Sequence, residues 1–521
     1  MTWIDKALDD CPQRVVINDS KTPSGRAHVG SLRGVLIHDA VARVARERGL
    51  DAAFMYGCDD MDAVDEIPHG TGEHFMEHLG KPLWSAPPPP GLDGTSMAEA
   101  YFTEFTATFD KLGVEVDFYR MSDIYRSGQL DGIIDTFLQA APKVREIYLK
   151  LSGAERSEDW LPFQPICEKC GRIGTTYATD YDGKTVAYEC RTDLVTWAEG
   201  CGHSGRISPF GGNGKLPWKL EWAAKWKLFG VSIEGAGKDH MAASGSHEVS
   251  SALARQVLQC QVPIPVPYEF FTLGGAKMSS SRGIGMTASE LTDLLPPDLL
   301  RYLVLRTQPR RSINFDLDVP SLNKAFVEYE RLWRSAAGDD PRPNESQLYA
   351  ISSATPEANV PPAPNFSPPF DSVLSLIQQP HVKITNHVAK LGVEMSAPDA
   401  DWLALKEATA QALTSSNPDL ASTLKMLDAP EAAKQRSALE DRQRDFLEQL
   451  AQRVDDLPTW EARAIQDAVF ESARDVGIDP KTNAPQVFEA LYKVLFGTET
   501  GPRAGSYLAF IGRDETLHRL R

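Results

Sequence analysis

The chain has few cysteines for its length and lacks long hydrophobic runs. Its 521 residues include seven cysteines. This number is small and odd, whereas a disulfide framework needs many cysteines in even number. No run of about 18 apolar residues occurs, and the N-terminal segment lacks the basic and apolar pattern of a signal peptide. We therefore expect a cytoplasmic protein, with no membrane partner, whose cysteines do something other than form disulfides.

Positive charge is also scarce. The sequence has 54 lysines and arginines against 72 acids, a formal net charge of −18. This balance argues against a protein that coats nucleic acid indiscriminately, because attraction to phosphates needs clustered cations. Residues 301–311 nevertheless hold four arginines and no acid. These arginines form a local basic face that could bind nucleic acid, or they are solvent-exposed residues at helix ends.

The first half of the chain has the pattern of an α/β protein. The length predicts about three domains, and no fixed-period repeat is present. A buried strand, a glycine-containing turn, a helix and a second strand open the chain, and further strands flank a helix about 150 residues later. This order predicts a Rossmann-type doubly wound parallel sheet. The expected strands are 14–18, 51–58, 230–237 and 267–273, and the expected helices are 31–49 and 247–260.

The sheet is expected to come in two halves, residues 1–60 and 216–285, separated by an insertion over 61–215. After residue 285 two helices are predicted, broken at Pro296 and Pro297. Residues 356–369 contain six prolines, so we predict a linker or surface excursion there. The helical spacing beyond it predicts an all-α C-terminal domain over 356–521.

Two glycine-containing loops follow predicted strands. In "KTPSGRAHVGS", residues 21–31, small and turn-forming residues leave backbone N–H groups open to a phosphate at the start of a helix, and His28 would lie over it. A buried histidine in an ordinary turn is the alternative. In "GGAKMSSSRG", residues 274–283, glycines, a lysine and three serines suit a loop that closes on a polyphosphate.

Together and in this order, "HVGS" and "KMSSS" resemble the HIGH and KMSKS signatures of class I aminoacyl-tRNA synthetases. Further sequence motifs are similar to those of the class I lysyl-tRNA synthetases, namely "PSGRAHVGS", "CDDMD", "GKDHMAASGS" and "LFGTETGPRAGSYLAFIG". The similarity extends over essentially the whole chain. The resemblance implies that L-lysine and ATP, with Mg²⁺, form lysyl-adenylate and pyrophosphate. The 2′-OH of the terminal adenosine of tRNA(Lys) then takes the lysyl group.

The resemblance also implies the nucleotide site. His28, Lys277 and Ser31 would stabilise the reacting phosphates. Ser31 differs from the residue that usually ends the first signature, but its hydroxyl can still donate to a phosphate. Asp239 would hold the ribose, unless it is only a helix N-cap. The ATP-binding residues implied in this way are Pro23, Ser24, Gly25, Gly30, Asp239, Met278, Ser279, Ser280 and Ser281.

A lysine pocket needs a carboxylate or an aromatic face for the ammonium and an apolar wall for the methylenes. By resemblance, Trp222, His240 and Tyr268 line this pocket. The acids that the sequence offers are Asp19 and the group Asp59, Asp60 and Asp62. The choice among them stays open, and a core helix face and a solvated acidic loop are the alternative interpretations.

Four of the seven cysteines lie within residues 167–201. A pair separated by two residues forms half of a tetrahedral thiolate site, and a returning pair can complete it. We predict one structural zinc ion on Cys167, Cys170, Cys190 and Cys201, in a subdomain over about 160–210. His203 in place of Cys190 and unligated thiols are the alternatives.

The resulting hypothesis is a lysine-tRNA ligase with a helical connector over 286–355 and an anticodon-binding domain over 356–521. Its partners would be tRNA(Lys), L-lysine and ATP, and a monomer is favoured. A glutamyl-type synthetase is the nearest rival, since it shares a helical C-terminal region but would need arginines in its pocket. A small-molecule nucleotidylyltransferase and a non-catalytic RNA-binding paralogue are further alternatives.

Overall fold

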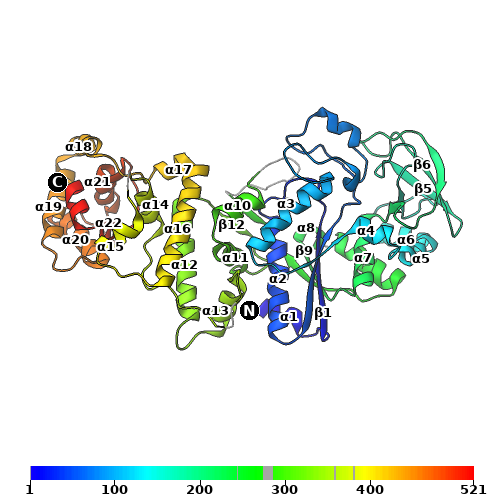
Figure 1. Ribbon diagram of the computed structural model, residues 1–521, viewed down its shortest axis with the longest axis horizontal. Helices are drawn as coiled ribbons and strands as arrows, with labels where there is room; N and C mark the ends of the chain where they lie inside the picture. Colours follow the sequence, from blue (N-terminus) through cyan, green and yellow to red (C-terminus); the bar gives the residue numbers. More distant parts are fainter. Residues whose placement is uncertain (1, 243–244, 274–284, 357–358, 380–381, 481) are drawn as a thin grey trace. The chain divides into compact units, whose positions relative to one another are not determined.

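The computed structural model describes residues 2–242, 245–273, 285–356, 359–379, 382–480 and 482–521. The signature residues Lys277, Met278, Ser279, Ser280 and Ser281 therefore lie outside the described residues. The chain divides into two compact units (Figure 1). The first comprises Met1–Thr292, Leu300–Phe315 and Ala350–Pro356, and the second Asp293–Leu299, Asp316–Tyr349 and Glu357–Arg521.

A five-stranded sheet organises the first unit, in the strand order β10-β9-β1-β2-β3. Every neighbouring pair is parallel, which confirms the doubly wound α/β prediction. The central strand β1 buries Val15, Val16 and Ile17 completely or nearly so. The strands are β1 (Arg14–Lys21), β2 (Asp51–Cys58), β3 (Asp117–Arg120), β9 (Ile233–Gly237) and β10 (Ile264–Tyr268).

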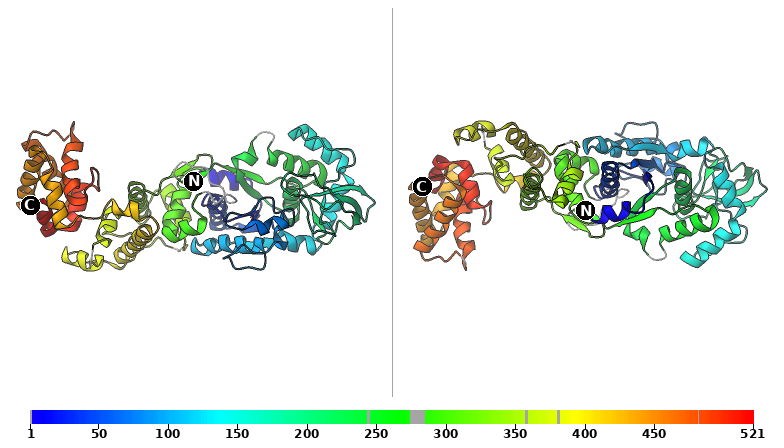
Figure 2. Two further views of the ribbon diagram at one scale, coloured as in Figure 1. Left: turned by 90° about the horizontal axis from the view of Figure 1, so that it is seen from above. Right: turned by 90° about the horizontal axis from the view of Figure 1, so that it is seen from below.

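Helices pack around these strands (Figure 2). The helix α2 (Ser31–Glu47) contacts β1, β2 and β9 through apolar residues that recur at helical spacing, which confirms the helix predicted over 31–49. The strand predicted over 267–273 is divided. The strand β10 ends at Tyr268, and β11 (Phe271–Leu273) pairs with β12 (Ile313–Phe315) in a separate sheet. Of the other helices, α1 (Thr2–Leu8) contacts β10 and α8 (Lys238–Met241) contacts β9. The helix α7 (Trp218–Phe229) packs against α9 (Ser246–Leu253), which continues as one π-helical turn, η3 (Ala254–Leu258).

The insertion predicted over 61–215 contributes to the central sheet. Its strand β3 pairs with β2 at the edge of that sheet. Its four residues are exposed or half-buried and none is fully buried, so they carry no buried-strand signal, as is usual for a short edge strand. The insertion otherwise forms small antiparallel sheets and helices. Their bounds are η1 (Glu73–His78), η2 (Leu83–Ser85), α3 (Met97–Lys111), α4 (Met121–Arg126), α5 (Asp131–Gln139), α6 (Ala141–Ser152), β4 (Gln164–Pro165), β5 (Thr176–Tyr181), β6 (Val186–Cys190), β7 (Ser204–Ile207) and β8 (Gly214–Lys215).

The regular secondary structure described in the second unit is helical, which confirms the all-α prediction. The predicted break between two helices is also confirmed, since α10 ends at Leu294 and α11 begins at Pro297. The segment 286–355 contributes residues to both units. The helices from residue 288 onward are α10 (Ala288–Leu294), α11 (Pro297–Leu305), α12 (Val319–Ala336), α13 (Pro343–Ser352), α14 (Phe370–Ile377), α15 (Ile384–Lys390), α16 (Ala397–Ser416), α17 (Pro418–Ser422), α18 (Ala429–Ser437), α19 (Asp441–Asp455), α20 (Ala462–Asp475), α21 (Ala484–Phe496), α22 (Ala504–Ile511) and α23 (Arg513–Leu520).

The proline-rich segment has no regular secondary structure among its described residues, but it is bonded to helices of its own unit. The indole of Trp333 on α12 donates to the Pro361 carbonyl at 2.8 Å. Lys406 on α16 donates to the Pro368 carbonyl at 2.6 Å. These side chains satisfy carbonyl groups that no helix or strand pairs. The segment is therefore packed on α12 and α16 rather than extended as a linker.

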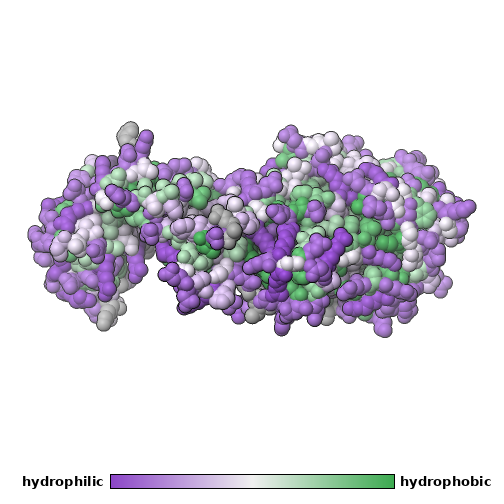
Figure 3. Space-filling view, turned by 60° about the horizontal axis from the view of Figure 1, so that its bottom comes forward, coloured by the Kyte–Doolittle hydropathy of each residue, from purple (hydrophilic) through white to green (hydrophobic). Residues whose placement is uncertain are grey.

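The surface is largely hydrophilic on the face that Figure 3 draws, with smaller groups of hydrophobic residues between. Within the described ranges, none of the helices has both the length and the apolar composition that crossing a membrane requires.

Candidate active site

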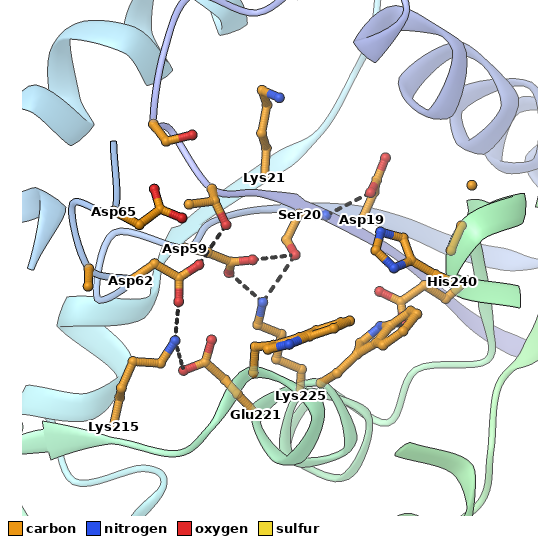
Figure 4. A pocket seen from close by; sticks show the side chains of 18 of the residues that line it. Asp19, Ser20, Lys21, Asp59, Asp62, Asp65, Lys215, Glu221, Lys225 and His240 are labelled. Carbon is orange, nitrogen blue, oxygen red and sulfur yellow. Dashed lines mark hydrogen bonds and ion pairs between the residues drawn. The ribbon is translucent and has the colours of Figure 1, made fainter. Parts of the chain in front are cut away.

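A cavity of about 660 Å³ lies at the carboxyl ends of β1, β2 and β9 (Figure 4). This is the edge at which doubly wound sheets bind their ligands. Among the described lining residues are six acids and three lysines, and no arginine. These charged residues are Asp19, Asp59, Asp62, Asp65, Glu221, Glu234, Lys21, Lys215 and Lys225.

Two of the lysines neutralise acids inside the cavity. Lys225 forms an ion pair with Asp59, and Lys215 forms one with Asp62 and a second, at 3.4 Å, with Glu221. Both lysine side chains are at most 4 % exposed. Burial opposes their charge, but the adjacent carboxylates raise the pKa of each ammonium above its ordinary value. Asp59 and Asp62 therefore already have cationic partners from the chain itself.

Asp60 and Asp19 have different surroundings. The Asp60 carboxylate lies outside the cavity lining and accepts hydrogen bonds from the backbone N–H and the hydroxyl of Ser122, at 2.8 and 2.5 Å. Asp19 lines the cavity, accepts from the Ser20 N–H at 2.8 Å and lies 3.4 Å from His38 Nδ1. Figure 4 shows Asp19 directed away from Lys215 and Lys225. Of the four acids that the sequence proposed, only Asp19 lines the cavity without a lysine partner.

A further acid, Glu234 on β9, lines the same cavity. Its carboxyl accepts hydrogen bonds from Asn18 Nδ2 at 2.7 Å, from Trp222 Nε1 at 2.8 Å and from the indole of Trp226. These donors are all neutral. Burial raises the pKa of Glu234 to about 7, although the indole donors and Lys225 oppose the shift. Sequence reasoning passed over this residue, and the available signal was a single acid within the otherwise apolar and glycine-rich "VSIEGAG".

This carboxyl should make stability depend on pH. A pKa of about 7 in the folded chain, against 4.5 ordinarily, means that the folded state binds more protons between these values, so the free energy of unfolding falls as pH rises. The loss should be on the order of 3 kcal/mol. Urea unfolding of the first unit at pH 5 and pH 7.5 should show a smaller decrease for Glu234→Gln than for the natural chain. An equal decrease in the free energy of unfolding for both proteins would contradict the raised pKa of Glu234.

The turn between β1 and α2 holds His28 in a defined orientation. His28 Nδ1 accepts the Gly30 N–H at 3.1 Å, which leaves the ring proton on Nε2. Burial, with a smaller contribution from the charge of Lys21, lowers the pKa of His28 to about 4. A Cβ at position 30 would lie 2.8 Å from the His28 ring, so this turn requires glycine. His28 is therefore a neutral hydrogen-bond donor at physiological pH.

His28 lines a second cavity, of about 370 Å³, which the residues Gly285, Met286 and Thr287 also line. The backbone of the turn bonds to this segment, since the Val29 N–H donates to the Met286 carbonyl at 3.1 Å. The segment directly follows residues 274–284, which carry the second signature. The fold thus brings the histidine turn beside Met286 and Thr287, which follow the second signature in the sequence.

The other predicted nucleotide-binding residues are near these cavities. Ser24 lines the first cavity, and Ser31 is the first residue of α2. Pro23 and Gly25 are buried in the turn. Asp239 lies in α8, between the cavity-lining residues Gly237 and His240. The N-cap of α8 is Gly237, so capping is not the role of Asp239.

The aromatic residues predicted for the amino-acid pocket do line the first cavity. The rings of Trp222 and His240 are 6.2 Å apart and nearly perpendicular. The Tyr268 hydroxyl lies 2.6 Å from where a Cβ of residue 34 would be, and Asp19 Oδ2 lies 3.0 Å from the same point. Glycine at position 34 thus allows Tyr268 and Asp19 to approach the first turns of α2.

Four cysteines gather in the insertion. The sulfurs of Cys167, Cys170, Cys190 and Cys201 all lie within 4.8 Å of one another, and two pairs are 3.7 Å apart. Tetrahedral thiolates at about 2.3 Å from a zinc ion would be about 3.8 Å apart. The set therefore fits a metal ion. His203 is outside this set, and its ring lies 6.0 Å from that of Tyr188.

The comparisons with known proteins agree with this geometry. A family model described as "tRNA synthetases class I (K)" matches residues 3–355, and one described as "Anticodon binding domain" matches residues 392–521. The chain belongs to the class I tRNA synthetases (K). The synthetase therefore combines an α/β catalytic unit with an all-α anticodon-binding domain.

Curated relatives match the synthetase over its full length. The chain is 32 % identical to the lysine–tRNA ligase of Thermoplasma volcanium, over 100 % of this chain and 99 % of that protein. Identity is 31 % to the lysine–tRNA ligase of Thermoplasma acidophilum, over 100 % and 98 % of the two chains. It is 31 % to that of Methanosarcina barkeri, over 99 % and 96 %.

Proposed function

We propose that the synthetase is a lysine-tRNA ligase, which activates L-lysine with ATP and transfers it to the 2′-OH of the terminal adenosine of tRNA(Lys). The full-length similarity to lysine–tRNA ligases supports the activity. The observation that carries the choice of amino acid is Glu234, a buried carboxyl in the cavity whose hydrogen-bond donors are all neutral. A buried carboxylate is stabilised by a cation, and the ammonium of lysine supplies one.

The orientation of lysine follows from where its carboxylate must react. The carboxylate has to meet the ATP α-phosphate, which belongs at the start of α2, beside Ser31 and His28. The substrate lysine would lie along strand β1. The strand covers about 10 Å from Lys21 to Asn18, and an extended lysine substrate fits this length. The ε-ammonium then reaches Glu234, which is bonded to Asn18. Asp19, beside the first turns of α2, is suited to the α-ammonium.

Formation of lysyl-adenylate depends on positioning lysine and ATP and on stabilising the charge of the phosphates, more than on proton transfer. His28 donates from Nε2 to a phosphate oxygen, and Ser31 donates its hydroxyl at the helix start. Lys277, with Met278, Ser279, Ser280 and Ser281, follows β11 in the sequence and would neutralise the pyrophosphate that leaves. Mg²⁺ accompanies ATP, and Asp239 binds the ribose. The methylenes of lysine lie against Trp222, His240 and Tyr268.

Zinc is the metal that the four cysteines favour, because a closed set of four thiolates is a typical structural zinc site. The ion would cross-link two segments of the insertion. Ile173 and Trp197, close to these cysteines in the chain, line the first cavity. The zinc subdomain thus contributes to the wall of the lysine site. In the second unit, the helical domain reads the anticodon of tRNA(Lys), and the reaction takes place where translation does, in the cytoplasm.

The test is amino-acid-dependent pyrophosphate exchange with each of the twenty amino acids. We expect exchange with L-lysine at least about 100-fold faster than with L-glutamate, because the described part of the lining has acids without a lysine partner and no arginine. Faster exchange with glutamate would establish the glutamyl-type alternative. Adenylation that is independent of amino acids would indicate a small-molecule nucleotidylyltransferase, and no adenylation of any substrate would indicate an RNA-binding paralogue.

A further inference from the structure

Lys21 is a cation of the active site that neither signature contains. It is the last residue of β1, and its Nζ lies 3.3 Å from the hydroxyl of Ser31, the first residue of α2. Its stem passes the ring of Phe105 on α3, with Nζ 6.0 Å from the ring centroid. The side chain lines the first cavity, and Figure 4 shows it pointing away from Lys215 and Lys225.

The three lysines of the cavity differ in how their charges are balanced. Lys215 and Lys225 have carboxylates in direct contact, and the pKa of each ammonium is raised. Within the described ranges Lys21 forms no ion pair with a carboxylate, and its ammonium donates a hydrogen bond to the neutral Ser31 hydroxyl. Burial lowers the pKa of the Lys21 ammonium, and the charge of Asp19 offsets this only in part.

Apart from Asp19, the charged groups around Lys21 are positive rather than negative. The N-terminus of a 17-residue helix, whose N-cap Gly30 makes no side-chain capping bond, carries the positive end of the helix dipole. The ammonium also contributes to the low pKa of His28. A partly buried cation beside a positive helix end costs free energy unless an anion lies between them. Asp19 offsets this cost only in part, so the arrangement is complementary to a further anion.

We propose that Lys21 is a catalytic residue of the activation step, and that its ammonium contacts a non-bridging oxygen of the ATP α-phosphate. This inference rests on the proposed function. In that step a carboxylate oxygen of lysine forms a bond to the α-phosphorus, and the bond from phosphorus to the pyrophosphate oxygen breaks. Pyrophosphate leaves with the electron pair, and no proton is transferred. The charge that gathers on the α-phosphate oxygens in the transition state is what Lys21, Ser31 and His28 stabilise.

The test compares Lys21→Met with the natural full-length chain. We expect kcat of lysine-dependent pyrophosphate exchange to fall about 100-fold, because an electrostatic donor to the transition state is removed. The dissociation constant for L-lysine in the absence of ATP should change much less. Exchange by Lys21→Ala should recover in part when ethylamine is added, because the small ammonium can occupy the vacated position. Lys143→Met, which removes an exposed lysine of α6 that is paired with Glu146, is the matched control.

The outcomes separate this inference from the proposed function. If the natural chain exchanges with lysine and Lys21→Met keeps the natural kcat, the role of Lys21 is refuted and the function stands. If Lys21→Met loses activity but ethylamine restores none to Lys21→Ala, Lys21 is structural and the inference is also refuted. If the natural chain shows no exchange with lysine, the proposed function fails and this inference fails with it.

Discussion

Glu234→Gln is expected to raise the dissociation constant for L-lysine about 100-fold or more. The substitution keeps the size of the side chain and an oxygen for the indole N–H of Trp222, but it removes the negative charge that the ε-ammonium meets in a buried site. Losing one partner of a buried charge pair costs about 2 to 5 kcal/mol. Isothermal titration with lysine in the absence of ATP measures this effect directly.

The pH dependence of lysine binding gives a second measure of the same role. The pKa of Glu234 is about 7, whereas the lysine ammonium stays charged well above that pH. Lysine affinity of the natural chain should therefore increase as pH rises from 6 to 8. In Glu234→Gln this increase should disappear, since the glutamine amide does not ionise.

Asp65→Asn is the matched control for the lysine site. Asp65 lines the same cavity but is exposed, so its loss should change lysine affinity far less than the loss of Glu234. A Glu234→Gln variant that binds lysine as tightly as the natural chain would show that the ε-ammonium binds elsewhere. The ε-ammonium would then bind Asp19, or the pairs Lys225–Asp59 and Lys215–Asp62 would open to receive it.

The second large effect is expected for His28→Ala, which should lower kcat of pyrophosphate exchange about 100- to 1,000-fold. His28 is neutral, with the proton on Nε2, so it can donate to a phosphate oxygen throughout the working pH range. Removing one such preorganised donor typically costs about 3 to 4 kcal/mol of transition-state stabilisation. Lysine affinity should be unchanged, because His28 lies outside the lining of the lysine cavity.

His74→Ala is the control for this substitution. His74 is an exposed residue of η1, so its removal should leave exchange at the natural rate. Because the pKa of His28 is about 4, the ratio of natural to variant rates should stay constant between pH 6 and pH 9. A ratio that changes with the titration of an ordinary histidine, or a His28→Ala variant of natural rate, would contradict this role.

Much of the architecture could be read from local patterns. The strands at 14–18 and 51–58, the helix at 31–49 and the helix break at Pro296 and Pro297 follow from apolar spacing and proline, and the structure confirms them. These signals are local because backbone geometry and the burial of one face depend on residues a few positions apart. The edge strand β3 gave no such signal, since none of its four residues is fully buried.

The active site could be predicted only in part. Trp222, His240, Tyr268 and Asp19, which the sequence analysis named for the amino-acid pocket, line the first cavity, and their role in binding stays a prediction. The sequence did not indicate that Lys225 and Lys215, more than 150 residues away from Asp59 and Asp62, would neutralise these acids. It also passed over Glu234 and Lys21, because neither belongs to a recognisable motif.

The sequence alone determined the family, the order of the two signatures, the α/β and all-α parts, and the set of cysteines that suits a metal. Each of these depends on spacing along the chain. Only the tertiary structure decided which charges of the cavity are already paired and which are left for a ligand. Charge balance in a buried site is set by distances between side chains from separate strands and helices, and these distances exist only after the chain has folded.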